Sequence, residues 1–96
     1  MIGVIATLRI KSDKNAEFEA VFAELATQVR ATESGNVAYQ LCRSRSEATT
    51  YKVLEIYHDE EALESHRASD HFRSAGSALG ALLEGRPEIE LLDAIG

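Results

Sequence analysis

The sequence predicts an α+β fold in which helices cover one face of a four-stranded antiparallel sheet. Hydrophobic side chains alternate with period two in four short segments, and they recur with a helical period in the segments between them. Taken in order, these two periods give β-α-β-β-α-β. The chain has 96 residues, which are too few for two hydrophobic cores. We therefore expect a single domain that spans residues 1–96.

The first strand and the first helix follow from a change of period near residue 11. Alternate residues from Ile2 to Ile10 are apolar, as on one face of a strand. The polar residues 12–15 could cap a helix, and the helical period then continues until Gly35. The apolar positions of this helix are Phe18, Val21, Phe22, Leu25, Ala26 and Val29.

Two further strands, Val37 to Cys42 and Thr50 to Tyr57, are joined by a short polar segment and predict an antiparallel pair. Apolar side chains occupy both faces of the later strand. Leu54 and Ile56 share one face, and Tyr51, Val53 and Tyr57 share the other.

This two-sided strand predicts a homodimer. The helices of so short a chain can cover only one face of the sheet, so we expect the other face to pack against a second copy of the chain. Such an interface would bury roughly 2,000 Å² or more in total. The alternative is a monomer with one face of its sheet in water.

Two helical stretches and a final strand complete the chain. Asp59 could cap a short helix that carries His66, and Asp70 could cap a second stretch. Residues 85–87, Gly-Arg-Pro, end this helical region, and alternation resumes over residues 88–93. The resulting order is that of the ferredoxin-like fold. The apolar positions of the second stretch are Phe72, Ala75, Leu79, Leu82 and Leu83.

Composition argues against several classes of partner. Ten basic residues face sixteen acidic ones, for a net charge of -6, so we expect no nucleic acid and no anionic membrane surface to bind. Cys42 is the only cysteine, which excludes an internal disulfide or a thiolate metal cluster within one chain. The N-terminus lacks the basic start and long apolar run of a signal peptide, and no segment has the pattern of a membrane span. We expect a cytoplasmic protein.

His66 is the first candidate for chemistry. It shares the apolar side of its predicted helix with Ala62 and Leu63. An imidazole with an ordinary pKa of about 6.5 can accept a proton at neutral pH, so His66 could act as a general base. The alternative is a structural histidine bonded to a backbone carbonyl.

Glu55 is the second candidate, because strand alternation places its carboxylate on the apolar face of the third strand. A half-buried carboxylate needs a partner or a raised pKa. It could orient a histidine or accept a hydrogen bond from a substrate hydroxyl, or it could pair with an arginine at an interface. Four aromatic side chains could wall a flat aromatic ligand or form part of an ordinary core: Tyr39, Tyr51, Tyr57 and Phe72.

The sequence lacks the usual patterns of cofactor binding. It has no glycine-rich phosphate loop and no nucleophile elbow. His58, His66 and His71 are too irregularly spaced to indicate a metal site. We expect no metal, flavin or haem.

Three segments together resemble the antibiotic biosynthesis monooxygenase family and its quinol monooxygenase branch. They are Glu33-Ser34-Gly35 leading to Tyr39, then Glu55-Ile56-Tyr57, and then residues 62–72 with the pattern His-x-x-Ser-x-His-Phe. The resemblance spans nearly the whole chain, and the glutamate strand followed by the histidine pattern is its most specific part.

The resemblance implies a dimeric α+β barrel with a pocket between the sheet and the helices of each chain. It implies a monooxygenase that acts on a small aromatic quinol or phenol with molecular oxygen and needs no cofactor. His66 would be the base or hydroxyl-binding group, and Glu55 would be its orienting partner. Tyr39, Tyr57 and Phe72 would wall the pocket.

Two other functions suit the same scaffold. One is an isomerase of a phosphorylated signalling sugar, which would need arginines to hold the phosphate. The other is a non-catalytic dimeric ligand-binding module, since a fold does not determine a function. The arginines available for a phosphate are Arg43, Arg45, Arg67 and Arg73.

Overall fold

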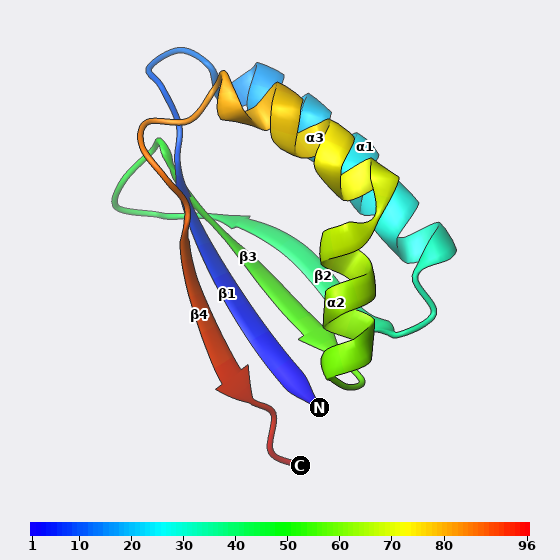
Figure 1. The fold of residues 1–96 in the computed structure, drawn as a ribbon. Coiled ribbons are helices and arrows are strands. Elements are labelled where there is room, and N and C mark those ends of the chain that lie inside the picture. Colours follow the sequence, from blue (N-terminus) through cyan, green and yellow to red (C-terminus); the bar gives the residue numbers. More distant parts are fainter.

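The computed structural model describes residues 1–96 and contains four strands and three helices (Figure 1). The predicted order is confirmed, with the second helical region divided into two helices. The elements are β1 (Ile2–Arg9), α1 (Asn15–Thr32), β2 (Asn36–Arg43), β3 (Thr50–Tyr57), α2 (Glu60–Ala68), α3 (Asp70–Gly80) and β4 (Glu88–Asp93).

The four strands form one antiparallel sheet in the order β2-β3-β1-β4, which is the ferredoxin-like arrangement. The register places Glu55 of β3 between Val4 of β1 and Tyr39 of β2. Because side chains opposite one another point to the same face, these three share a face of the sheet. Figure 1 shows that all three helices lie on one side of the sheet.

The main core lies between α1 and the sheet. The apolar side of α1 is buried against β1, β2 and β3, as its period predicts. Figure 1 shows α3 running beside α1, with α2 across the end of the sheet where β3 ends. The buried residues of this core are Ala6, Leu8, Ile10, Phe18, Phe22, Leu25, Ala26, Val29, Tyr39, Tyr51, Val53 and Leu82.

The helix caps differ in part from those predicted. Asp59 caps α2 as expected, and its Oδ1 accepts a hydrogen bond from the backbone N–H of Ala62 at 2.8 Å. The cap of α3 is Ser69 instead of Asp70, since Ser69 Oγ accepts from the N–H of Phe72 at 3.2 Å and Asp70 is already helical. No side chain caps α1, because its N-cap position is occupied by Lys14.

The end of α3 also differs from the prediction. The helix stops at Gly80, before Leu82 and Leu83, because glycine is a poor helix former. Leu82 still enters the core, and Leu83 pairs with Ile10 in an isolated bridge. None of the helices combines the length and the apolar character that crossing a bilayer requires.

Candidate active site

A cavity of about 550 Å³ lies between the sheet and its helices. Its floor comes from the helix-facing side chains of all four strands, and its walls come from the three helices and the segment before β4. Most of the lining is apolar, with four ionisable side chains among the residues. The lining residues are Val4, Ala6, Leu8, Phe22, Leu25, Tyr39, Val53, Glu55, Leu63, His66, Arg67, Phe72, Gly76, Leu79, Gly80, Leu83, Pro87 and Ile89.

His66 reaches this cavity from α2. Leu63 and His66 are the buried residues of that helix, and their spacing of three puts them on one face. The imidazole is surrounded by aromatic rings, with centroid distances of 5.4 Å to Tyr39, 5.3 Å to Tyr57 and 4.7 Å to Phe72. Only 3% of His66 is exposed, so its ring is held in one place by packing.

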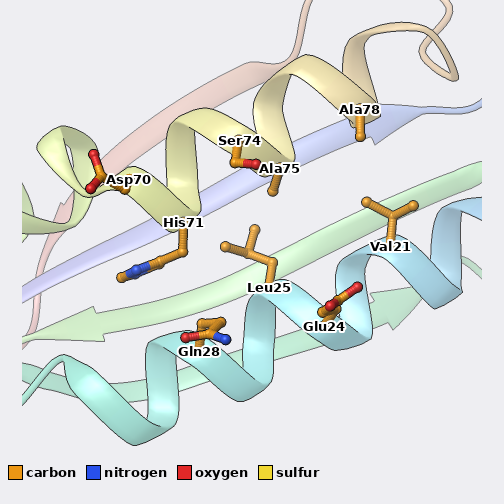
Figure 2. A pocket seen from close by; sticks show the side chains of 9 residues that line it. All are labelled: Val21, Glu24, Leu25, Gln28, Asp70, His71, Ser74, Ala75 and Ala78. Atoms are coloured by element: carbon orange, nitrogen blue, oxygen red, sulfur yellow. The ribbon is translucent and has the colours of Figure 1, made fainter.

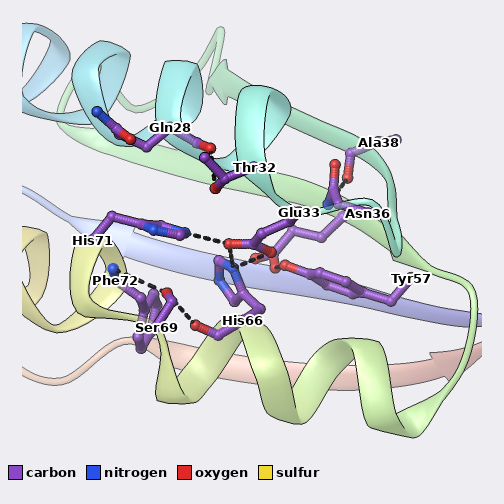
Figure 3. Close-up of polar contacts among 11 residues, drawn as sticks. Gln28, Thr32, Glu33, Asn36, Ala38, Tyr57, His66, Ser69, His71 and Phe72 are labelled. Atoms are coloured by element: carbon purple, nitrogen blue, oxygen red, sulfur yellow. Dashed lines mark hydrogen bonds and ion pairs between the residues drawn. The ribbon is translucent and has the colours of Figure 1, made fainter.

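Glu33 is the hydrogen-bond partner of His66 (Figure 3). His66 Nδ1 lies 3.0 Å from Glu33 Oε1 and 2.9 Å from Oε2. An ionised carboxylate only accepts hydrogen bonds, so Nδ1–H donates and Nε2 is the unprotonated nitrogen of a neutral ring. Nε2 has no partner within the chain, yet every fully buried side-chain nitrogen and oxygen has one. Nε2 is therefore open to the cavity.

Burial keeps this histidine neutral. Desolvation lowers the pKa of His66 below its ordinary value of 6.5, and it outweighs the opposite effect of the hydrogen bond from His66 to Glu33. Electrostatic interactions with His71 and Arg67 lower this pKa further. At neutral pH the ring can therefore accept a proton at Nε2.

Glu55 lies on the cavity floor, but its partner is not His66 as the sequence suggested. Glu55 Oε1 accepts a hydrogen bond from the hydroxyl of Tyr57 at 2.7 Å. The two side chains are two residues apart on β3 and so point to the same face, which brings them together. His66 instead meets Glu33, because α2 crosses the sheet beside the end of α1.

Burial raises the pKa of Glu55 to about 7, although the hydrogen bond from Tyr57 opposes this shift. Glu55 is therefore poised between its acid and its carboxylate form at neutral pH. Its Oε2 and the hydroxyl of Tyr39 make no hydrogen bond within the chain, and by the same reasoning as for Nε2 of His66 both are open to the cavity. Burial also raises the pKa of Tyr39, which keeps its phenol protonated.

The three predicted wall residues separate into two groups. Tyr39 and Phe72 line the cavity, as expected. Tyr57 does not line it, since the side chain is fully buried behind Glu55 and serves to hold that carboxylate. His66, Glu55, Tyr39 and Phe72 thus meet at one cavity.

Sequence reasoning gave no role to Glu33 or His71. His71 Nε2 lies 2.5 Å from Glu33 Oε2, so the carboxylate is placed between two imidazoles (Figure 3). The contact of Glu33 with His66 spans 33 positions of the sequence, and its contact with His71 spans 38. No local pattern reveals contacts over such separations. The one signal in the sequence was an acidic residue, Glu33, at the end of the first predicted helix, together with two histidines five positions apart.

Glu33, His66 and His71 form the one group of side chains suited to ligating a metal, with donor atoms within 4.8 Å of one another. The oxygen–nitrogen spacing of 2.9 Å is that of a hydrogen bond, and the spacing of 2.5 Å is shorter still. Ligand atoms around a tetrahedral ion at about 2.1 Å would lie about 3.4 Å apart. The geometry therefore fits imidazole N–H groups that donate to a carboxylate.

The fold and the site define a ferredoxin-like domain with an apolar cavity and a neutral histidine that opens into it. A model of the family described as antibiotic biosynthesis monooxygenase matches residues 1–77. The chain belongs to this family, and its function at the level of the family is monooxygenase-like.

Individual relatives agree with this assignment. YcnE of Bacillus subtilis (strain 168), named for a proposed monooxygenase function, is 34% identical over 73 residues, which are 76% of each chain. A Caulobacter crescentus CB15 structure, described as a proposed antibiotic biosynthesis monooxygenase, is 49% identical with a TM-score of 0.96 and covers 99% of this chain and 90% of its own. A conserved protein from Methanosarcina mazei Go1 is 27% identical with a TM-score of 0.89. The match covers 95% of this chain and 89% of that protein.

Proposed function

We propose that this protein is a cofactor-independent monooxygenase that acts on a small aromatic quinol or phenol, with His66 as its base. The observation that carries the proposal is a buried histidine whose Nδ1 is bonded to Glu33 and whose Nε2, without a partner in the chain, is open to a mostly apolar cavity. A flat aromatic ring fits between the apolar walls, and its hydroxyl would meet the polar atoms of His66, Glu55 and Tyr39.

The reaction balances without a resident cofactor. A hydroquinone and O₂ give a hydroxyquinone and water, so the substrate itself supplies the two electrons that reduce the second oxygen atom. His66 Nε2 takes the proton of the substrate hydroxyl, and the resulting anion is electron-rich enough to pass an electron to O₂. The same proton can leave with the water, which returns His66 to its neutral form. The cavity contributes by excluding bulk water from the reactive anion.

The site gives little support to the isomerase alternative. Of the four arginines considered for a phosphate, only Arg67 lines the cavity. Arg67 already pairs with Glu64 at 3.1 Å, and Arg73 pairs with Asp70 at 3.2 Å on the surface. A phosphate in this cavity would thus face largely apolar walls.

Oxygen uptake with a panel of small hydroquinones tests the proposal. His66→Ala should lower the turnover number by a factor on the order of 10²–10⁴, as loss of a general base commonly does. His58→Ala is the matched control, because His58 is an exposed histidine on the chain between β3 and α2. Transfer of one ¹⁸O atom from ¹⁸O₂ to the product would support monooxygenation. Wild-type activity in His66→Ala would rule out His66 as the base.

The absence of a cofactor is tested separately. Purified active protein should contain no stoichiometric metal by elemental analysis and no visible absorption band that follows activity. A metal or chromophore that copurifies with activity in fixed ratio would contradict the proposal.

We propose further that the protein is a homodimer joined through the face of the sheet that the helices leave open. Leu54 of β3 is 43% exposed on this face and Leu92 of β4 is 40% exposed, while Ile5 and Ile56 are half-buried beside them. These four side chains form an apolar patch toward one end of the face, whose other end carries charged side chains. An exposed apolar patch is typical of an interface. The expected burial of roughly 2,000 Å² or more would make the dimer stable at micromolar concentration.

A further inference from the structure

We propose that Glu33 and His71 are a positioning pair, in which His71 anchors Glu33 and Glu33 fixes His66 with Nδ1–H outward and Nε2 toward the cavity. The proposal rests on the proposed role of His66 as a base. Neither Glu33 nor His71 lines the cavity, so both act through His66. They are positioning residues, not catalytic ones.

Glu33 needs a second anchor to hold His66 in one tautomer. It follows the last turn of α1, where its N–H still donates to Val29 O at 3.0 Å, but its side chain turns on three rotatable bonds. About 10% of that side chain is exposed, so water competes for the carboxylate. The hydrogen bond from His71 Nε2 holds Oε2 from the outer side, while Nδ1–H of His66 approaches from the inner side (Figure 3).

The junction between α2 and α3 brings the two histidines to one carboxylate. Residues five apart on a continuous helix do not share a face, but Ser69 interrupts the helix with an extended backbone. Its Oγ donates to the carbonyl of His66 at 2.7 Å and accepts from the N–H of Phe72 at 3.2 Å. This serine links the last turn of α2 to the first turn of α3, and so fixes where His71 stands relative to His66.

His71 occupies the outer end of the arrangement. About 20% of its side chain is exposed, against 3% for His66. Figure 2 shows it at the end of the groove between α1 and α3, where it borders Leu25 and Gln28. The Glu33 carboxylate thus lies between an interior histidine and one at the surface, and the outer ring keeps water from replacing His66 as its partner.

The chemical consequence concerns the choice between two tautomers. A neutral His66 with its proton on Nε2 would present an N–H to the substrate hydroxyl and could not accept its proton. A carboxylate held at Nδ1 selects the productive form and stabilises the imidazolium that forms when the substrate proton arrives. The role of Glu33 is therefore to set the tautomer, and the role of His71 is to keep Glu33 in place.

The test uses three variants of the 96-residue chain and two independent readouts. Glu33→Gln removes the charge, His71→Leu removes the outer donor, and His71→Gln keeps an N–H donor near the position of Nε2. His58→Leu is the control for loss of a histidine. The first readout is the tautomer of His66 from ¹⁵N chemical shifts of the imidazole nitrogens. The second is the turnover number with a small hydroquinone, recorded together with its KM.

We expect the Nδ1–H tautomer in the wild type and in His71→Gln, and a mixture of tautomers in His71→Leu and Glu33→Gln. Glu33→Gln should lower the turnover number by up to about 10⁴-fold, as replacing the group that fixes a catalytic histidine does. His71→Leu should lower it about tenfold, as loss of one supporting hydrogen bond would, with little change in KM. His71→Gln should recover most of that loss.

Unchanged tautomer and turnover in His71→Leu would overturn the proposal, as would an equal loss in His71→Gln. One Zn²⁺ bound per wild-type chain, and lost in His71→Leu, would also overturn it by making the cluster a metal site. If no hydroquinone supports oxygen uptake, the proposed function fails while the ¹⁵N shifts still judge the pair. His71→Gln keeps the test valid if His71→Leu does not fold.

Discussion

The two faces of the sheet differ although the same strands build both. On β3, Tyr51, Val53, Glu55 and Tyr57 point to the helices and are at most 8% exposed, whereas Leu54 points the other way and is 43% exposed. The covered face carries ionisable and hydroxyl groups, several of them with fixed partners. The open face carries an apolar patch without a cover, beside charged side chains. The covered face therefore suits chemistry, and the open face suits association.

The two faces are also stabilised by different interactions, hydrogen bonds on the covered face and burial of apolar surface on the open face. A polar group on the covered face is stable only if hydrogen bonds replace water, and Glu55 and His66 both have such bonds. On the open face the stabilisation available is removal of apolar surface from water, and it needs a second molecule. Substitutions on the two faces should therefore change different measurements.

Among substitutions that change assembly or stability, the largest effect is expected on the open face, from Leu54→Lys. A lysine there would place a charge in the proposed interface, so we expect the dimer dissociation constant to rise by about 100-fold or more. Sedimentation velocity at micromolar concentration should then show mainly a species of about 10.5 kDa, the mass of one chain. Gln28→Lys on the exposed side of α1 is the control and should stay dimeric. A dimer that persists in Leu54→Lys would move the interface elsewhere.

On the covered face, Glu55→Gln should make the protein more stable at high pH. The pKa of Glu55 rises from 4.5 to about 7 on folding, so the folded chain holds more protons than the unfolded chain between these values. Stability contributed by this group is lost as pH rises through that window. The glutamine variant should gain up to about 3 kcal/mol at pH 8 and little at pH 4.

Urea unfolding at both pH values measures this difference. Glu24→Gln is the matched control, because Glu24 is an exposed carboxylate on α1. An equal effect of Glu55→Gln at pH 4 and pH 8 would mean that the carboxylate is not buried in its charged form.

The next effect tests how α2 is held over the covered face. A Cβ built on Gly35 would lie 2.5 Å from Cβ of Ala62, so the turn before β2 packs directly on α2. Gly35→Ala should cost about 2 kcal/mol of unfolding free energy, as overpacking does. Ala62→Gly removes the clash, so the double variant should be more stable than the two single losses predict. Additive losses in thermal unfolding would show that the contact is not the cause.

Much of the fold could be predicted from local patterns. Strand alternation placed Leu54 and Glu55 on opposite faces, and the helical period identified the buried side of α1. The partner of His66 could not be predicted, because Glu33 is 33 residues away, just after α1, and meets His66 of α2 only in the folded chain. The sequence pattern suggested Glu55 as the partner of His66, because Glu55 lies on the apolar face of its strand. The pattern could not show that the Tyr57 hydroxyl already donates a hydrogen bond to that carboxylate.

The smallest effect concerns the cap of α3, where sequence and structure chose neighbouring residues. Ser69 Oγ accepts from the N–H of Phe72, whereas the side chain of Asp70 is fully exposed and bonds only to Arg73. Ser69→Ala should cost about 1 kcal/mol, the usual loss for an N-cap, while Asp70→Ala should cost only a few tenths through the helix dipole. Thermal unfolding of both variants distinguishes them. Ser69 also bonds to the carbonyl of His66, so its loss should loosen the junction that carries His66 and His71. The hydrogen-exchange rate at His71 should therefore rise in Ser69→Ala and stay unchanged in Asp70→Ala. A larger loss in Asp70→Ala would instead make Asp70 the working cap, as the sequence suggested.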